Sequence, residues 1–179
     1  MCTPKIKEIF SYKYVTNILD DRVISPCDGR EDIFVDKLMD LSNLSFSLTQ
    51  NDIIGHGVVK FIKVFPPGEK FQLRIVPYVK KQGFWVRCVF SVYRPDLCAS
   101  LLKPNEVWHN SVKPFEEELK VCPPEKGVIL DFTNLTCSIT FEFSDRNLVG
   151  SYKVVTTLVG NKGSNFCVQI LMDLNIASE

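Results

Sequence analysis

Apolar and polar residues alternate with a period of two along much of this chain, and that pattern restricts the folds open to it. Such alternation is typical of β-strands that turn one face toward a core. Segment 135–143 (LTCSITFEF) shows it most cleanly, with an apolar residue or a cysteine at every odd position. Further strands are predicted at 44–48, 57–65, 71–79, 84–93, 150–159 and 165–173. About eight strands predict an all-β fold in which two sheets pack as a β-sandwich or open as a β-cup.

Turn-forming residues join some of these strands in pairs. The sequence PPGE at 66–69 predicts a hairpin over 57–79. The sequence GNKGS at 160–164 contains two glycines that can adopt positive φ, and it predicts a second hairpin between 150–159 and 165–173.

Two segments depart from simple alternation. The strand predicted at 84–93 (FWVRCVFSVY) has apolar residues on both faces, as in a central strand or a strand between a core and a cavity. Beyond it, prolines interrupt the pattern, and Pro95 stands where a helix tolerates proline at its start. Short helices are predicted at 96–102 and 105–112, so the fold contains a short helical insertion at about 94–119.

The composition fits one globular domain that spans residues 1–179. Single domains usually contain about 100–200 residues. Hydrophobic residues make up 45% of the chain and charged residues 23%, close to the averages of soluble proteins. The 13 Phe residues add aromatic surface that cannot form hydrogen bonds, and such surface requires either a core or an apolar ligand.

Seven cysteines are spread over the whole chain, at positions 2, 27, 88, 98, 122, 137 and 167. Zinc sites need ligands about two to four residues apart, and the closest pair here is Cys88 and Cys98, so we expect no metal and no cofactor. Scattered cysteines in a β-rich chain predict disulfides and an oxidising compartment, whereas the alternative is a cytosolic protein with buried free thiols. The spacing of the cysteines does not determine which of them are bonded to each other. Because their number is odd, at least one remains unpaired, and Cys2 is the candidate.

The sequence predicts a secreted, extracellular protein. No stretch approaches the roughly 18 consecutive apolar residues of a membrane-spanning helix. Residues 1–20 contain no apolar signal core, so a secreted protein of this sequence has already lost its signal peptide. Asn43 and Asn134 each begin an Asn-x-Ser/Thr tripeptide, which predicts N-glycosylation on the surface of a secreted glycoprotein.

Charge and histidine content argue against several functions. Lys and Arg total 21, as do Asp and Glu, so no net charge attracts nucleic acid or an anionic membrane. His56 and His109 are the only histidines, which leaves little room for a Ser-His-Asp or Cys-His catalytic device. The chain also lacks G-x-S-x-G, H-E-x-x-H and a phosphate-binding glycine loop. We therefore predict structural or surface roles for both histidines and a protein that is not an enzyme.

Short sequences in the middle and at the end of the chain are similar to those of a known family. They are GFW at 83–85, RPDLC at 94–98, Trp108, Cys122, GSYKV at 150–154 and Cys167. In these features the chain from about 36 to 173 resembles the insect secreted CheB-type family, which is related to the ganglioside-activator and ML lipid-recognition proteins. The resemblance implies a secreted, ML or immunoglobulin-like sandwich or cup whose sheets separate to admit lipid-like molecules, and it links the chain to chemosensation. It implies neither catalytic residues nor a cofactor.

The resemblance also implies a disulfide pattern. Cys98 and Cys122 would close the helical insertion, and an N-terminal cysteine such as Cys27 would be bonded to Cys167 in the last strand. Cys88 and Cys137 both lie on inward faces of predicted strands, where they either bridge the two sheets or remain reduced.

The sequence leaves two functions open. The first is a secreted protein that holds or presents a small hydrophobic molecule or lipid, because pockets for such ligands are concave and mainly apolar. Its candidate wall residues, which would equally suit a closed core, are Phe61, Phe71, Phe84, Phe90, Phe141, Phe143, Tyr152, Leu158 and Phe166. The second is a secreted signalling or salivary effector that acts through its surface on a cell-surface receptor, without a bound ligand. Its candidate surface is the insertion at 94–119, with an exposed Trp108 and the acidic run at 116–118.

Overall fold

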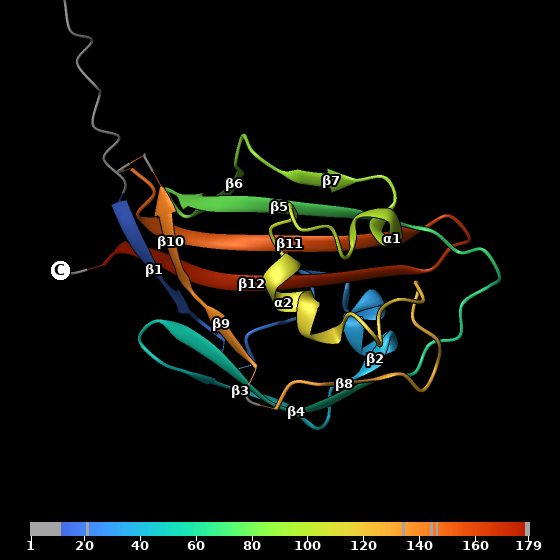
Figure 1. The fold of residues 1–179 in the computed structure, drawn as a ribbon. Helices are drawn as coiled ribbons and strands as arrows, with labels where there is room; N and C mark the ends of the chain where they lie inside the picture. The colour runs from blue at the N-terminus through green and yellow to red at the C-terminus, as the bar shows by residue number, and fades with distance from the viewer. Residues whose placement is uncertain (1–11, 21, 134, 144, 146, 178–179) are drawn as a thin grey trace, which may run out of the picture.

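Two antiparallel β-sheets face each other and form the body of the protein (Figure 1). The computed structural model describes residues 12–20, 22–133, 135–143, 145 and 147–177. In the larger sheet the strand order is β10-β1-β12-β11-β5-β6, and β7 also pairs with β5. In the smaller sheet β2, β3, β8 and β9 all pair with β4. The predicted all-β sandwich is therefore confirmed.

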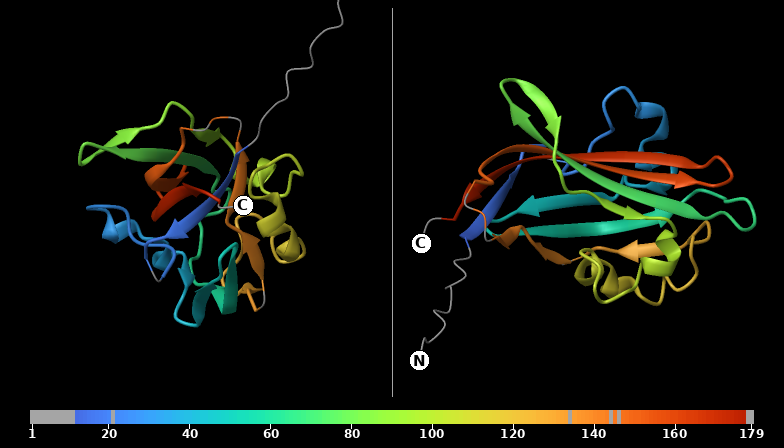
Figure 2. Two further views of the ribbon diagram at one scale, coloured as in Figure 1. Left: turned by 90° about the vertical axis from the view of Figure 1, so that its left-hand side faces the viewer. Right: turned by 90° about the horizontal axis from the view of Figure 1, so that it is seen from above.

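The strands are short at the sheet edges and long in the centre of the larger sheet. The larger sheet contains β1 (Tyr12–Ile18), β5 (Phe71–Lys81), β6 (Phe84–Arg87), β7 (Val92–Arg94), β10 (Thr140–Phe143), β11 (Gly150–Gly160) and β12 (Asn165–Ile176). The smaller sheet contains β2 (Met39–Asp40), β3 (Leu44–Leu48), β4 (Asp52–Phe61), β8 (Ile129–Asp131) and β9 (Thr136–Ser138). The helical turns are η1 (Glu31–Ile33), η2 (Val35–Lys37), α1 (Leu97–Ser100), α2 (His109–Val112) and η3 (Lys113–Phe115). The turns η1 and η2 lie on the side of the sandwich opposite to the insertion that holds α1 and α2 (Figure 2).

The hairpin predicted at 150–173 is confirmed as β11 and β12. Opposite residues pair in a continuous antiparallel register, for example Val154 with Ile170. The turn contains a glycine at φ +95°, a conformation that residues with a Cβ rarely adopt. The buried carboxylate of Glu69 closes this turn, because it accepts hydrogen bonds from the backbone N–H of Lys162 (2.9 Å) and the hydroxyl of Ser164 (3.1 Å).

The hairpin predicted over 57–79 is wrong, because β4 and β5 belong to different sheets. β5 pairs instead with β11, from Phe71 opposite Gly160 to Val79 opposite Tyr152. The predicted turn at 66–69 is confirmed, because the N–H of Glu69 donates to the carbonyl of Pro66 (3.1 Å), and the two prolines have no N–H for a strand ladder. A turn of this kind does not determine whether the chain returns in the same sheet or crosses to the other one.

Two stretches predicted as single strands are each divided in two. Within 84–93, β6 and β7 both pair with β5, but residues 88–91 between them leave the ladder. Within 135–143, β9 belongs to the smaller sheet and β10 to the larger one. Ile139 lies at the crossing: its N–H donates to the carbonyl of Asn51 (2.8 Å), and its carbonyl accepts from the N–H of Thr16 (3.0 Å). This crossing ties the two layers together.

The hydrophobic core lies between the sheets, beside the insertion. Its buried members are Leu38, Phe61, Phe71, Phe115, Leu119, Leu130 and Phe166. Phe115 and Leu119 come from the insertion, and the Phe115 ring packs on Phe132 with 4.8 Å between ring centroids. Burial of a side chain of this size stabilises a fold by about 1.5–3 kcal/mol. The insertion is therefore part of the core and not only a cover over it.

Polar contacts fix the start of the insertion. The Asp96 carboxylate caps α1 by accepting a hydrogen bond from the N–H of Ala99 (3.1 Å). The Arg94 guanidinium donates two hydrogen bonds, of 2.7 and 2.8 Å, to the buried carboxylate of Glu106. These bonds hold the pKa of Glu106 below its ordinary value. The Cys98–Cys122 disulfide then closes the insertion covalently.

The segment after β1 continues along the edge of β12. Ser25 pairs with Gln169 in an antiparallel bridge, and Phe34 pairs with Cys167 in a parallel one. The disulfide between Cys27 and Cys167, with 5.8 Å between the Cα atoms, fastens the segment to the larger sheet. Residues 22–38 therefore form a second wall of the sandwich, opposite the insertion.

Candidate functional site

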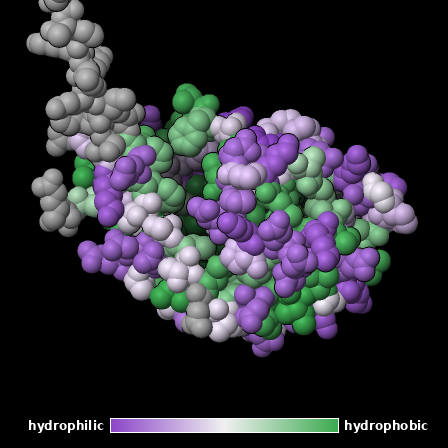
Figure 3. Space-filling view, viewed as in Figure 1, coloured by the Kyte–Doolittle hydropathy of each residue, from purple (hydrophilic) through white to green (hydrophobic). Residues whose placement is uncertain are grey.

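The space between the sheets is not completely filled. β11 pairs on both sides, yet none of its 11 residues is buried, and its inward side chains Tyr152, Val154, Thr156 and Leu158 are only half-buried. A closed sandwich buries the inward side chains of its central strands. Figure 3 shows a recess bordered by hydrophobic residues where Figure 1 draws β11 and β12 between β10 and α2. Solvent therefore reaches apolar side chains between the sheets.

A cavity of about 280 Å³, called here the larger apolar cavity, lies between the larger sheet and the insertion. The sheet contributes Leu73, Ile75, Thr156, Leu158, Phe166, Cys167 and Val168; the insertion contributes Leu97, Leu101, Trp108 and Val112; η2 contributes Val35. The Trp108 indole N–H donates to the carbonyl of Leu101 (3.0 Å), which fixes the ring against the cavity. The polar group of this tryptophan is thus satisfied while its apolar surface faces the cavity.

A second cavity of about 190 Å³, the smaller apolar cavity, lies deeper between the two sheets. Phe61, Phe65 and Phe71 form part of its wall, and Cys122 borders it beside the disulfide of the insertion. The two apolar cavities share the wall residues Leu97, Leu101 and Leu158. No polar surface lines either cavity, so both suit a ligand without charge.

The candidate wall residues fall into two groups. Phe61, Phe71, Leu158 and Phe166 line one or both apolar cavities, and Tyr152 is half-buried on the inward face of β11, where its hydroxyl donates to the carbonyl of Leu148 (2.9 Å). The other four are exposed by 76% (Phe84), 58% (Phe90), 46% (Phe141) and 42% (Phe143) and line neither cavity. The reason is their position, because β6 and β10 are the two edges of the larger sheet and residue 90 lies outside the ladder.

The disulfide pattern that the family resemblance implies is present. Cys27 is bonded to Cys167, and Cys98 is bonded to Cys122. Cys88 and Cys137 carry free thiols, which decides between the two alternatives for this pair. Cys88 lies beside β5 in the larger sheet, with its N–H bonded to Pro77, whereas Cys137 lies in β9 of the smaller sheet. Burial raises the pKa of the Cys88 thiol. Cys2 lies outside the described residues.

The remaining candidates lie at the surface or in the wall of a cavity. Asn43 is exposed, and Asn134 lies outside the described residues. His56 is exposed, with its Nε2 2.8 Å from the Ser47 hydroxyl. His109 is half-buried in α2. The expectation of an exposed Trp108 is wrong, since its ring lines the larger apolar cavity. In the described part of the chain, no cluster of three or more His, Cys, Asp or Glu residues could hold a metal ion.

Sequence comparison adds no assignment. The chain matches no protein-family model and no curated protein sequence. In the part of the chain that the structure describes, no helix is both long enough and apolar enough to span a membrane. Two disulfides are typical of extracellular proteins. The shape and the lining of the cavities therefore carry the functional argument.

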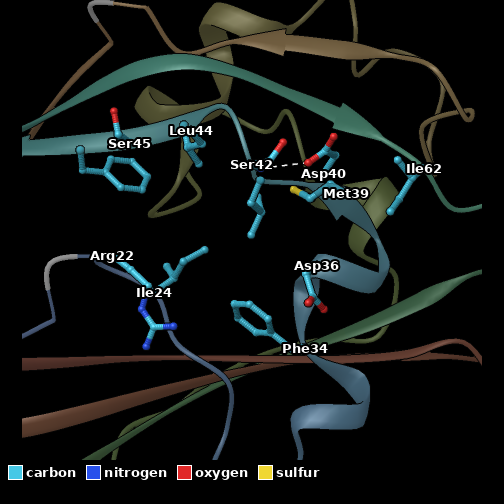
Figure 4. A pocket seen from close by; sticks show the side chains of 12 residues that line it. Arg22, Ile24, Phe34, Asp36, Met39, Asp40, Ser42, Leu44, Ser45 and Ile62 are labelled. Carbon is cyan, nitrogen blue, oxygen red and sulfur yellow. Dashed lines mark hydrogen bonds between the residues drawn. The ribbon is translucent and has the colours of Figure 1, made fainter.

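A third cavity was not predicted from the sequence. This edge cleft, of about 620 Å³, lies between the N-terminal segment and the strands β2 and β3 (Figure 4). The alternation at 44–48 identified Leu44 and Phe46 as apolar residues on one face. Segment 22–38, which forms the facing wall, shows no regular alternation, so its sequence does not indicate which side chains turn inward.

Proposed function

We propose that this protein is secreted and binds a hydrophobic, lipid-like molecule on the inward face of its larger sheet, beside the insertion, without catalysing a reaction. The observation that carries the proposal is the partial exposure of the inward side chains of β11, a central strand, above a cavity with a wholly apolar lining. Apolar surface in contact with water is unfavourable by about 25 cal/mol per Å². An apolar ligand that covers these side chains removes that cost. In a closed core these side chains would already be buried, and no such cost would remain.

The size of the interior supports a small ligand. Sites for small molecules usually measure about 300–1,000 Å³. The larger apolar cavity, at about 280 Å³, is close to the lower end of that range, and the smaller one shares part of its wall. Because neither cavity offers a charged group, we expect the ligand to be uncharged along the part that enters.

The sequence resemblance supports the same proposal independently of the cavities. Resemblance to the CheB-type and ML lipid-recognition families implies a sandwich that admits lipid-like molecules, and some members of those families are linked to chemosensation. The two disulfides support an extracellular site of action. Cavity shape, lining and resemblance thus favour a carrier or presenter over an effector that acts through its surface alone.

The experiment is a ligand search followed by a matched pair of variants. The protein is purified from a secreting eukaryotic host, analysed by native mass spectrometry for bound lipid, and titrated with the apolar dye N-phenyl-1-naphthylamine. Thr156 and Thr157 are neighbours in β11 whose side chains point to opposite faces of the sheet, and Thr156 alone of the two lines the larger apolar cavity.

Thr156→Phe should weaken dye binding about tenfold or more, because a larger side chain occupies the ligand space at a cost of about 1–3 kcal/mol. Thr157→Phe should leave dye binding unchanged. Absence of both bound lipid and dye binding in the wild-type protein would overturn the proposal. Equal dye affinity of Thr156→Phe and the wild type would place the ligand elsewhere.

A further inference from the structure

The edge cleft shares one wall residue, Met39, with the smaller apolar cavity and none with the larger one. One wall comes from the N-terminal segment, with Ile24 and Phe34. The other comes from β2, β3 and the residue that follows β4, with Met39, Leu44 and Ile62. In Figure 4 these apolar side chains extend toward one another across the cleft. Its volume of about 620 Å³ lies well inside the range of about 300–1,000 Å³ for small-molecule sites.

The stretch from Phe34 to Met39 separates the cleft from the interior. Phe34 and Asp36 line the edge cleft, whereas Val35 lines the larger apolar cavity and Leu38 the smaller one. The stretch is held in place because Phe34 pairs with Cys167 and the carbonyl of Leu38 accepts from the N–H of residue 62 (3.0 Å). A ligand in the cleft and a ligand in the interior therefore contact opposite sides of the same wall.

Unlike the interior, the cleft carries charge. Arg22 lies toward one end, and Asp36 and Asp40 lie toward the other (Figure 4). The charge of Arg22 is balanced by a pair of hydrogen bonds to Asp20, of 3.2 and 3.1 Å. Asp36 forms a 3.2 Å ion pair with Lys37. These two charges are therefore already partnered.

Asp40 differs from both. Its Oδ1 atom accepts a hydrogen bond from the backbone N–H of Ser42 (2.9 Å), and this bond is the main reason why its pKa lies below the ordinary value. The carboxyl group is thus an anion at neutral pH. Within the described residues it has no ion-pair partner within 4.0 Å. Lys60, which lies opposite Asp40 in β4, also lowers this pKa through its charge, but it does not line the cleft. The acidic end of the cleft is therefore lined by two carboxylates, Asp36 and Asp40, and by no basic side chain.

We propose that the edge cleft is a second binding site, which takes an amphiphile with an apolar chain and a cationic head group. The chain lies between Phe34 and Leu44, and the head group pairs with the carboxylate of Asp40. An uncharged molecule forms no ion pair with the carboxylates that line this end, and an anionic amphiphile meets like charge there. This site does not depend on a ligand in the larger apolar cavity, because the edge cleft and that cavity share no wall residue.

The test compares three probes with the same chain and different head groups. Dodecylamine, dodecanol and dodecanoate are titrated by calorimetry at pH 7 into the wild type and into Thr156→Phe, with the amine and the carboxylate below their micelle concentrations and the alcohol below its solubility limit. The three head groups are compared in Thr156→Phe, because its interior site is filled. A primary amine is protonated at this pH, since its pKa is near that of Lys, about 10.4. The expected order of affinity is amine, then alcohol, then carboxylate.

A matched pair of variants isolates the charge. Asp40→Asn keeps the oxygen that accepts from the Ser42 N–H but removes the charge, and it should weaken dodecylamine about fivefold or more with little effect on dodecanol. Asp131→Asn is the control, because Asp131 accepts the same type of hydrogen bond, from the Thr133 N–H (2.8 Å), but does not line the cleft. It should leave all three affinities unchanged.

Several results would overturn the proposal: no binding of dodecylamine, affinity for dodecanol or dodecanoate that equals or exceeds that for the amine, or equal effects of Asp40→Asn and Asp131→Asn. The interior variant Thr156→Phe separates the two sites. It should weaken dye binding about tenfold or more while dodecylamine still binds, so either site can fail without the other. Loss of dodecylamine binding in Thr156→Phe would place the amine in the interior and refute a separate cleft site.

Discussion

The two disulfides close chain segments of very different length, and this difference predicts how much each one stabilises the fold. Cys27 and Cys167 are 140 residues apart in sequence, whereas Cys98 and Cys122 are 24 apart. In the chain-entropy description, a crosslink removes freedom from the unfolded chain, and its contribution rises with the logarithm of the enclosed length. That relation gives about 5.0 kcal/mol for the long loop and about 3.4 kcal/mol for the short one at 25 °C.

The assay is urea unfolding of paired alanine variants. Cys27 and Cys167 are replaced together in one protein and Cys98 and Cys122 together in another, so that no new free thiol is created. In every protein compared, the wild-type reference included, the remaining cysteines Cys2, Cys88 and Cys137 are also changed to alanine, which prevents disulfide exchange. With equal dependence of unfolding free energy on urea, the long-loop variant should lose about 1.6 kcal/mol more than the short-loop variant.

Two outcomes of the disulfide experiment would differ from this prediction. Equal losses, or a larger loss for the short loop, would contradict the entropic reasoning. A larger loss for the short loop would also mean that the insertion depends on its disulfide for packing, since Phe115 and Leu119 of the core lie within that loop.

Three further predictions concern single positions. Gly57→Ala should lower the free energy of unfolding in urea by about 3 kcal/mol or more, because φ is +93° and an added Cβ would lie 1.8 Å from a backbone oxygen. The control Gly83→Ala, at φ +86° in open space, should lower it by less than half as much. Phe115→Ala should cost about 3–5 kcal/mol in the same assay, and a loss below 1 kcal/mol would show that the insertion is not part of the core. Asp28→Asn should cost about 0.5–1 kcal/mol at pH 7, a small value because Asp28 is 67% exposed. Hydrogen bonds from Lys153 and Gln169 lower the pKa of Asp28. The stabilisation from Asp28 is therefore present above its ordinary pKa near 4 and is lost as pH falls through the folded-state value. A stability difference between the wild type and Asp28→Asn that grows in acid would contradict this prediction.

Local patterns predicted most strands and the insertion. The alternation at 44–48 corresponds to β3, and the predicted glycine turn joins β11 to β12. The prolines after Tyr93 do introduce a helical insertion. β1 was missed although Tyr12, Tyr14 and Thr16 alternate with polar or smaller residues, because one weak strand near a terminus is hard to distinguish from a loop. β8 is only three residues long and has no detectable period.

The partners of the strands were not predictable in the same way. Alternation tells which side chains share a face but not which sheet a strand joins, so β4 and β5 were paired wrongly and the crossing at Ile139 was missed. The same limit explains the candidate site. Phe84 and Phe166 are equally apolar in sequence, but Phe84 lies in an edge strand and is exposed, whereas Phe166 lies under the insertion and is 4% exposed.

The long disulfide also connects the fold to the space available for ligands. Cys167 lines the larger apolar cavity and pairs with Phe34, whose ring lines the edge cleft on the other side of the same stretch. Removing its bond to Cys27 therefore releases loop entropy and also loosens the wall between the two sites. A stability loss well above about 5 kcal/mol in the long-loop variant would mean that this wall loses its packing as well. A loss well below that value would mean that backbone pairing at Ser25 and Phe34 keeps the wall in place without the covalent bond.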